Sequence, residues 1–165
     1  MIPRRGKMKP FKASEIMQIA VAIEENGEKL YSHAKTLTDD AKTKELFDFL
    51  AAEETKHKKI FEGMLAKAEQ YQPPESYPGE YYEYLGAYAR NIVFPPDVMK
   101  KELAGITDVA SALEFGIQRE IESILYYLEA RNIVPERQRD EIGKIVDEER
   151  RHYLKLVDVK KDLAV

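Results

Sequence analysis

The strongest constraint on this 165-residue chain is a motif that occurs twice. Residues 53–57 (EETKH) and residues 148–152 (EERRH) both follow the pattern E-E-x-x-H. The second glutamate and the histidine of each copy are three residues apart, so on an α-helix they share one face and can reach the same ion. The two pairs are Glu54 with His57 and Glu149 with His152.

A further glutamate precedes each copy at nearly the same distance. Glu24 stands 30 residues before the second glutamate of the first copy, and Glu120 stands 29 residues before that of the second copy. Glu24 falls on the apolar face of its predicted helix, where an ionised carboxylate is costly unless a cation or another partner compensates its charge. The chain therefore contains an internal repeat of helical hairpins with matching inward glutamates.

A tyrosine follows each upstream glutamate by seven residues, almost two helical turns: Tyr31 after Glu24, and Tyr127 after Glu120. Two interpretations are open. The hydroxyls either donate hydrogen bonds to carboxylates that bind a metal, or belong to core aromatic residues with some other polar partner. We favour the first interpretation.

Four glutamates and two histidines that converge inside a helical bundle make a site for two divalent or trivalent cations. Oxygen and imidazole ligands suit iron or manganese, whereas a closed structural zinc site more usually includes thiolates. A single E-x-x-H is most often a solvated helix face, but two matched copies favour metal binding. The predicted ligands are Glu24, Glu54, His57, Glu120, Glu149 and His152.

The neighbouring titratable residues are assigned to the surface. Glu53 and Glu148 are rotated by about 100° from the predicted ligands and are expected to be ordinary surface charges. His33, the third histidine of the chain, lies nine residues after Glu24 and projects from the opposite side of that helix. We expect it to be a surface residue rather than a ligand.

Helical periodicity of apolar residues predicts four long helices, at about 14–36, 41–71, 107–132 and 135–161. A crossover at 72–106, with one short helix at about 80–92 and a break at Pro95-Pro96, joins the second helix to the third. Expected helix starts are Ser14, residues 38–40, residues 107–108 and Pro135. The prediction is an all-α four-helix bundle of two hairpins, with one domain over 1–165.

Composition excludes several classes of function. The net charge of −4 provides no basic field for a phosphate backbone, so nucleic acid is not expected as a partner. The absence of cysteine excludes disulfides, thiol catalysis, iron–sulfur clusters and rubredoxin-type iron within this chain. Residues 1–12 are basic but precede no long apolar stretch, and no apolar run could span a bilayer. We expect a cytoplasmic protein without membrane association.

The chain resembles the rubrerythrin branch of the ferritin-like superfamily over nearly its whole length. The resemblance lies in residues 22–31 (AIEENGEKLY), 52–57 (AEETKH), 113–127 (LEFGIQREIESILYY) and 147–152 (DEERRH). It implies that Glu24 and Glu120 are terminal carboxylates, that Glu54 and Glu149 bridge both metals, and that His57 and His152 each bind one ion. It also implies a homodimer and two iron ions, with manganese or zinc as alternatives.

Two features depart from the family pattern. Rubrerythrins usually carry a rubredoxin domain with four cysteines that supplies electrons, whereas this chain has no cysteine and needs an external electron donor. They also carry a further glutamate three residues after the third-helix ligand, where this chain has Ser123. The ligand exchange that this glutamate performs as iron changes oxidation state is therefore not expected here.

Three functions are compatible with the sequence. The first is a di-iron oxidoreductase that reduces hydrogen peroxide, or dioxygen more slowly. The second, which Ser123 favours, is a ferroxidase or iron-handling protein. The third is a binding protein that a metal stabilises without catalysis.

Overall fold

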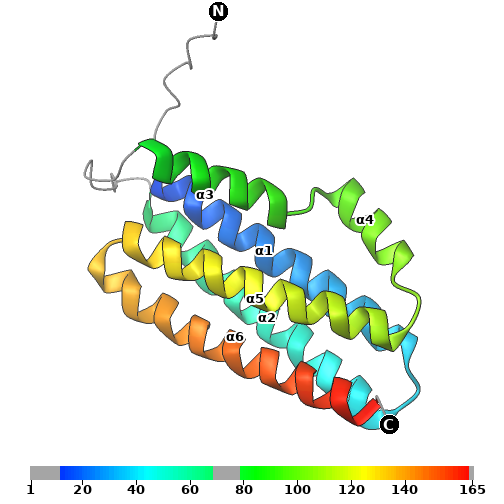
Figure 1. Cartoon of the computed structure of the whole chain (residues 1–165). Helices are drawn as coiled ribbons and strands as arrows, with labels where there is room; N and C mark the ends of the chain where they lie inside the picture. Colours follow the sequence, from blue (N-terminus) through cyan, green and yellow to red (C-terminus); the bar gives the residue numbers. More distant parts are fainter. Residues whose placement is uncertain (1–11, 69–78, 164–165) are drawn as a thin grey trace, which may run out of the picture.

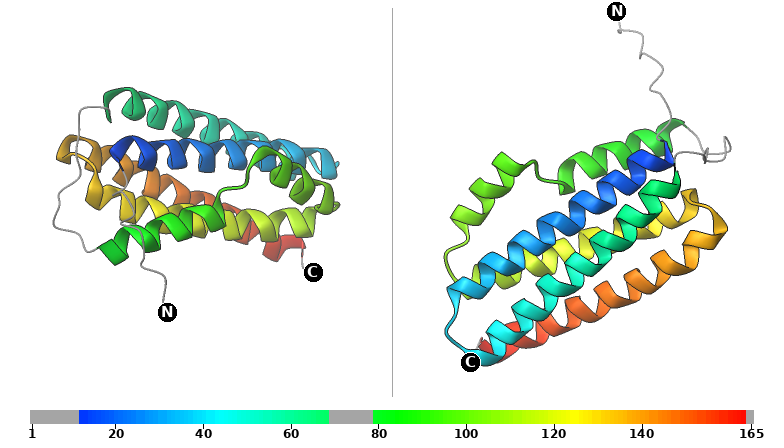
Figure 2. Two further views of the ribbon diagram at one scale, coloured as in Figure 1. Left: turned by 90° about the horizontal axis from the view of Figure 1, so that it is seen from above. Right: turned by 180° about the vertical axis from the view of Figure 1, so that it is seen from behind.

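Four long helices form two hairpins that pack side by side into one bundle (Figures 1 and 2). The first hairpin contains α1 (Ala13–Ala34) and α2 (Ala41–Ala68), joined through the short 3₁₀ helix η1 (Lys35–Leu37). The second contains α5 (Val109–Ile133) and α6 (Glu136–Leu163). The predicted all-α four-helix bundle is therefore confirmed.

The structure is a computed structural model that describes residues 12–68 and 79–163. Residues 69–71, predicted to end the second helix, and the first residues of the crossover lie outside these ranges. Within the described ranges, each long helix begins and ends within about two residues of its predicted bounds. No helix in this part of the chain has the length and apolar character that a membrane span requires.

Two of the predicted helix caps are present and one is wrong. Asp40 and Asp108 each accept a hydrogen bond from the backbone N–H three residues later, at 2.8 and 2.7 Å, and so cap α2 and α5. Ser14, in contrast, already lies inside α1. The Glu15 carboxylate accepts the backbone N–H of Lys12 at 2.8 Å, so the helix begins one residue earlier than predicted.

The crossover contains two helices rather than the single one predicted. The expected helix is α3 (Gly79–Ile92), but a second helix, α4 (Pro96–Gly105), follows it. The Pro95-Pro96 pair does separate α3 from the next helix. Pro96 is also the first residue of α4, where a missing N–H removes no helical hydrogen bond. Both helices lie on the outside of the bundle (Figure 1).

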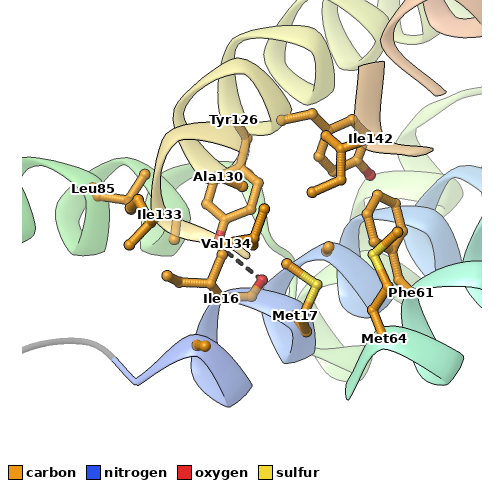
Figure 3. Close-up of a cluster of buried hydrophobic side chains, with 14 of the residues drawn as sticks. Ile16, Met17, Phe61, Met64, Leu85, Tyr126, Ala130, Ile133, Val134 and Ile142 are labelled. Carbon is orange, nitrogen blue, oxygen red and sulfur yellow. Dashed lines mark hydrogen bonds between the residues drawn. The ribbon is translucent and has the colours of Figure 1, made fainter. Parts of the chain in front are cut away.

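The apolar core consists of two clusters of buried residues. Figure 3 shows the first, where Tyr126 packs among aliphatic and aromatic side chains and its hydroxyl donates to the Ile16 carbonyl at 3.1 Å. The second gathers around Leu30, Phe47 and Leu113. Glu24 lies between Ala20 of the first cluster and Leu30 of the second on α1, so a polar layer separates the two clusters.

Candidate metal centre

All four long helices contribute to a buried cluster of carboxylates and imidazoles between the two apolar clusters. α1 provides one glutamate and α5 another, while α2 and α6 each provide a glutamate and a histidine from their E-E-x-x-H motifs. Each of these residues is at most 5% exposed. They are the six predicted ligands: Glu24, Glu54, His57, Glu120, Glu149 and His152.

The six residues form two groups of four that have two members in common. One group adds Glu24 and His57 to the shared pair, the other adds Glu120 and His152, and the shared pair is Glu54 and Glu149. In each group one potential ligand atom per residue lies within 4.8 Å of all the others. This arrangement suits two neighbouring cations with the shared carboxylates between them.

The histidines face each other across Glu149. Oε1 of Glu149 lies 2.9 Å from Nδ1 of His57, and Oε2 lies 3.0 Å from Nδ1 of His152. The two rings are nearly parallel, with centroids 5.7 Å apart. Nδ1 of each ring therefore points into the carboxylate cluster and is the nitrogen available to an ion there.

Two of the glutamates are costly to ionise, and two buried carboxylate oxygens lack a hydrogen-bond donor in the described part of the chain. Burial raises the pKa of Glu24 and of Glu120 well above the usual value, and repulsion from Glu54 and Glu149 raises both further. Among the residues that the structure describes, Oε2 of Glu24 and Oε1 of Glu54 accept no hydrogen bond. Buried oxygen atoms without a donor are expensive, and a bound cation would satisfy them.

Without a bound metal, the two histidines supply the positive charge that offsets the carboxylates. Burial alone lowers the pKa of His57, but contacts with Glu149 and Glu24 outweigh it and raise this pKa to about 12. The same balance raises the pKa of His152 to about 9. The buried anionic cluster thus attracts positive charge, and its oxygen and imidazole donors fit two metal ions.

The two tyrosines donate to the cluster, but each reaches across to the other hairpin. Tyr31 of α1 donates to Glu120 of α5, and Tyr127 of α5 donates to Glu24 of α1. Both hydroxyls are buried. Of the two interpretations left open by the sequence, the structure matches the one in which the hydroxyls orient carboxylates of the candidate site.

Gly27 lets the Glu54 carboxylate lie close to the backbone of α1. A Cβ atom built on Gly27 would lie 2.5 Å from Oε2 of Glu54, closer than real Cβ contacts come. The Glu54 carboxylate therefore occupies space that only glycine leaves open at this position of α1. The sequence analysis did not identify Gly27, although it stands three residues after Glu24, on the same helix face.

A small pocket reaches the cluster beside Glu54 and Glu120. Its volume of about 20 Å³ has room for about one water-sized molecule. Ser123 lines this pocket and donates to the backbone carbonyl of Glu120 at 2.8 Å. Arg119 and Glu122, which form an ion pair that the sequence analysis missed, complete one wall.

Two surface assignments are corrected by the structure. Glu148 is not an ordinary surface charge, because its Oε2 lies 2.6 Å from Nε2 of the buried His57. Glu53 has a ligand atom within 4.8 Å of those of both residues. His33, expected to be a surface residue, is half-buried instead, and its Nε2 lies 2.8 Å from the Ile106 carbonyl after α4.

Comparison with known proteins agrees with this geometry. The sequence model of the rubrerythrin family matches residues 15–160. The crystal structure of a provisionally assigned ferritin-like diiron-carboxylate protein from Thermotoga maritima superposes with a TM-score of 0.69 at 25% identity, covering 93% of this chain and 97% of that one. No curated protein matches the sequence.

The bundle and its two groups of ligands with shared carboxylates define a ferritin-like protein with a site of the di-iron type. Because the family match extends over most of the sequence, the chain belongs to the rubrerythrin family.

Proposed function

We propose that this protein is a di-iron oxidoreductase that reduces hydrogen peroxide, and dioxygen more slowly, with electrons from an external donor. The observation that carries the proposal is the pair of four-residue groups sharing Glu54 and Glu149. In this arrangement Glu24 and His57 would hold one ion, Glu120 and His152 would hold the other, and the two shared carboxylates would be available to both.

The donor set supports iron. Four carboxylates and two imidazoles are hard or borderline ligands that stabilise both ferrous and ferric ions, whereas no thiolate is present to favour a structural zinc site. Bound iron would supply a two-electron reduction, in which one peroxide and two protons become two waters while two Fe(II) become two Fe(III). The electrons that restore Fe(II) come from a separate donor, because this chain holds no cysteine for a rubredoxin-type centre.

The pocket supports a very small substrate. Its space for about one water-sized molecule, next to Glu54 and Glu120, suits a substrate of one or two heavy atoms better than an organic molecule of ordinary size. Ser123 and Arg119 are among the residues that line this space, and their hydroxyl and guanidinium groups are of the kinds that hydrogen-bond peroxide. Dioxygen fits the same space but accepts hydrogen bonds less well.

The test is a comparison of two oxidants. Anaerobic protein loaded with Fe(II) is mixed rapidly with peroxide or with dioxygen, and ferric absorption in the near ultraviolet is followed. We expect faster oxidation by peroxide, and little oxidation at the site in Glu54→Ala. Equal rates with the two oxidants would contradict the peroxidase assignment.

Ser123 favours a second candidate, a ferroxidase. The family's further glutamate is absent from this position, so the carboxylate exchange that accompanies peroxide reduction in relatives has no counterpart here. A ferroxidase would turn over added Fe(II) with dioxygen, and an iron-storage protein would retain iron beyond the two ions of the site. Retention of two ions with no turnover of added Fe(II) would exclude both.

A further inference from the structure

The imidazole of His57 makes contacts on both of its nitrogen atoms. Nδ1 faces the candidate centre and lies 2.9 Å from Oε1 of Glu149. Nε2 faces the opposite direction and lies 2.6 Å from Oε2 of Glu148. His57 is fully buried, whereas the Glu148 side chain is 25% exposed. The neighbouring residues Glu148 and Glu149 of α6 thus contact the two sides of one imidazole from α2.

This contact matters because a neutral imidazole has one N–H. If Nδ1 binds an ion, the proton resides on Nε2 and is donated to Glu148. A carboxylate in this place fixes the tautomer and the ring orientation, and it makes the imidazole a stronger electron donor to the metal. Glu148 is suitably placed to do all three at His57.

The other histidine lacks such a partner. Within residues 12–68 and 79–163, the carboxylates within 4.0 Å of His152 all contact Nδ1 and none contacts Nε2, and the ring packs edge-on against Phe49, with centroids 5.9 Å apart at 89°. Glu53 is the counterpart of Glu148 in the repeat, but it contacts Lys56 at 3.4 Å and gathers near His57 rather than near His152. The internal repeat is therefore broken in the surroundings of the two histidines.

We propose that Glu148 is a positioning residue that holds His57 for metal binding and makes the two metal positions unequal, with the tighter position at Glu24 and His57. The inference requires the two-metal site but is independent of the oxidant. It concerns the order in which the positions fill, which can be measured without turnover.

An outer cation between Glu53, His57 and Glu148 is the competing interpretation, since these three could also hold an ion. The surrounding charges oppose it. Nζ of Lys56 lies 3.7 Å and Nη2 of Arg151 3.9 Å from Oε1 of Glu148, so two cations already neutralise this corner. An outer ion would also compete for the Nε2 that donates to Glu148.

The experiment is a titration of metal-free protein with Co²⁺ alone, followed by visible absorption and calorimetry. The wild type should bind two ions in separate steps. In Glu148→Ala the tighter step should weaken by about 10–100-fold, with a smaller change in the weaker step. Glu148→Gln keeps an acceptor oxygen and should lie between Glu148→Ala and the wild type.

Glu53→Ala is the matched control, because it removes the same charge from the same corner without removing a hydrogen bond to His57. It should leave both steps nearly unchanged. The inference is overturned if the wild-type steps are equal, if Glu148→Ala binds as the wild type does, or if Glu53→Ala has the same effect. A third Co²⁺ that both variants lose would establish the outer cation instead. Failure of wild-type protein to bind any Co²⁺ would count against the two-metal site itself.

Discussion

Tyr127 on α5 donates a hydrogen bond to Glu24 on α1, and so fixes a carboxylate that belongs to the other hairpin. Tyr31 on α1 does the same for Glu120 on α5. Each tyrosine stands seven residues after the glutamate of its own helix, yet its partner is the equivalent glutamate across the bundle. The candidate metal centre is thus also one of the places where polar contacts join the two hairpins.

Tyr127→Phe should weaken metal binding, because Glu24 loses the donor that orients it. Loss of this buried hydrogen bond should also lower the free energy of unfolding by about 1–3 kcal/mol. Co²⁺ titration and urea unfolding measure the two effects. Tyr126→Phe is the control, because its hydroxyl donates to the Ile16 carbonyl, away from the site. Equal metal affinity in the two variants would contradict the role of Tyr127.

Gly27→Ala should impair the site while leaving the fold intact. The new Cβ would lie 2.5 Å from Oε2 of Glu54, so this carboxylate must move away from its place between the two ligand groups. Gly63→Ala on α2 is the control, since its Cβ would meet nothing within 4 Å. We expect Gly63→Ala to stabilise α2 by about 0.5–1 kcal/mol and to bind metal normally. Normal metal binding by Gly27→Ala would show that Glu54 does not need its present position.

Metal removal should lower the melting temperature of the wild type, because the buried carboxylates lose the cations that compensate them. Glu54→Ala should lose most of this metal-dependent difference. Without metal, the variant should suffer less electrostatic repulsion among the buried carboxylates than the wild type. It removes a carboxylate whose Oε1 accepts no hydrogen bond within the described residues. Calorimetry with and without chelator provides the comparison. A melting temperature of the wild type that is indifferent to chelator would contradict a metal at this buried site.

The homodimer expected from the family resemblance remains a prediction, and one surface is suited to it. Ile121, Leu125 and Leu154 are 37%, 49% and 57% exposed and line one apolar groove on α5 and α6. Burying this groove against a second copy would remove apolar surface from water. Sedimentation should show a dimer that Leu125→Lys with Leu154→Lys dissociates. A dimer unaffected by this double variant would place the interface elsewhere.

The cluster of candidate ligands could be predicted from the sequence because it depends on spacing within single helices. A separation of three residues places Glu54 beside His57 on any α-helix, whatever the tertiary structure. The same argument identified Glu149 and His152, and the matched distances of the repeat identified Glu24. The structure brings these residues together as the spacing indicated.

Contacts between helices could not be predicted in this way. The contact between His57 and Glu148 depends on how α2 and α6 are rotated about their axes, because each residue along a helix turns the side-chain direction by about 100°. The crossed pairing of Tyr31 with Glu120 has the same origin. Residue spacing determines which side chains share a face of one helix, while packing between helices determines which residue of the neighbouring helix lies opposite.

The second crossover helix was missed for a different reason. Two consecutive prolines favour a break, but Pro96 also begins α4, which inserts Met99 into the core. The half-buried state of His33 follows from the same region, because the chain after α4 brings the Ile106 carbonyl to its ring. Proline is common both in loops and at the first residue of a helix, so the sequence at Pro95-Pro96 does not distinguish the two.

The most direct test of the central claim is the number of iron ions bound per chain by anaerobically purified protein after reconstitution with Fe(II). The account predicts two in the wild type and in Glu53→Ala, and fewer than two in Glu54→Ala, which removes a carboxylate common to both ligand groups. A wild-type protein that binds no iron, or a Glu54→Ala variant that retains two ions, would contradict a di-iron site at these six residues.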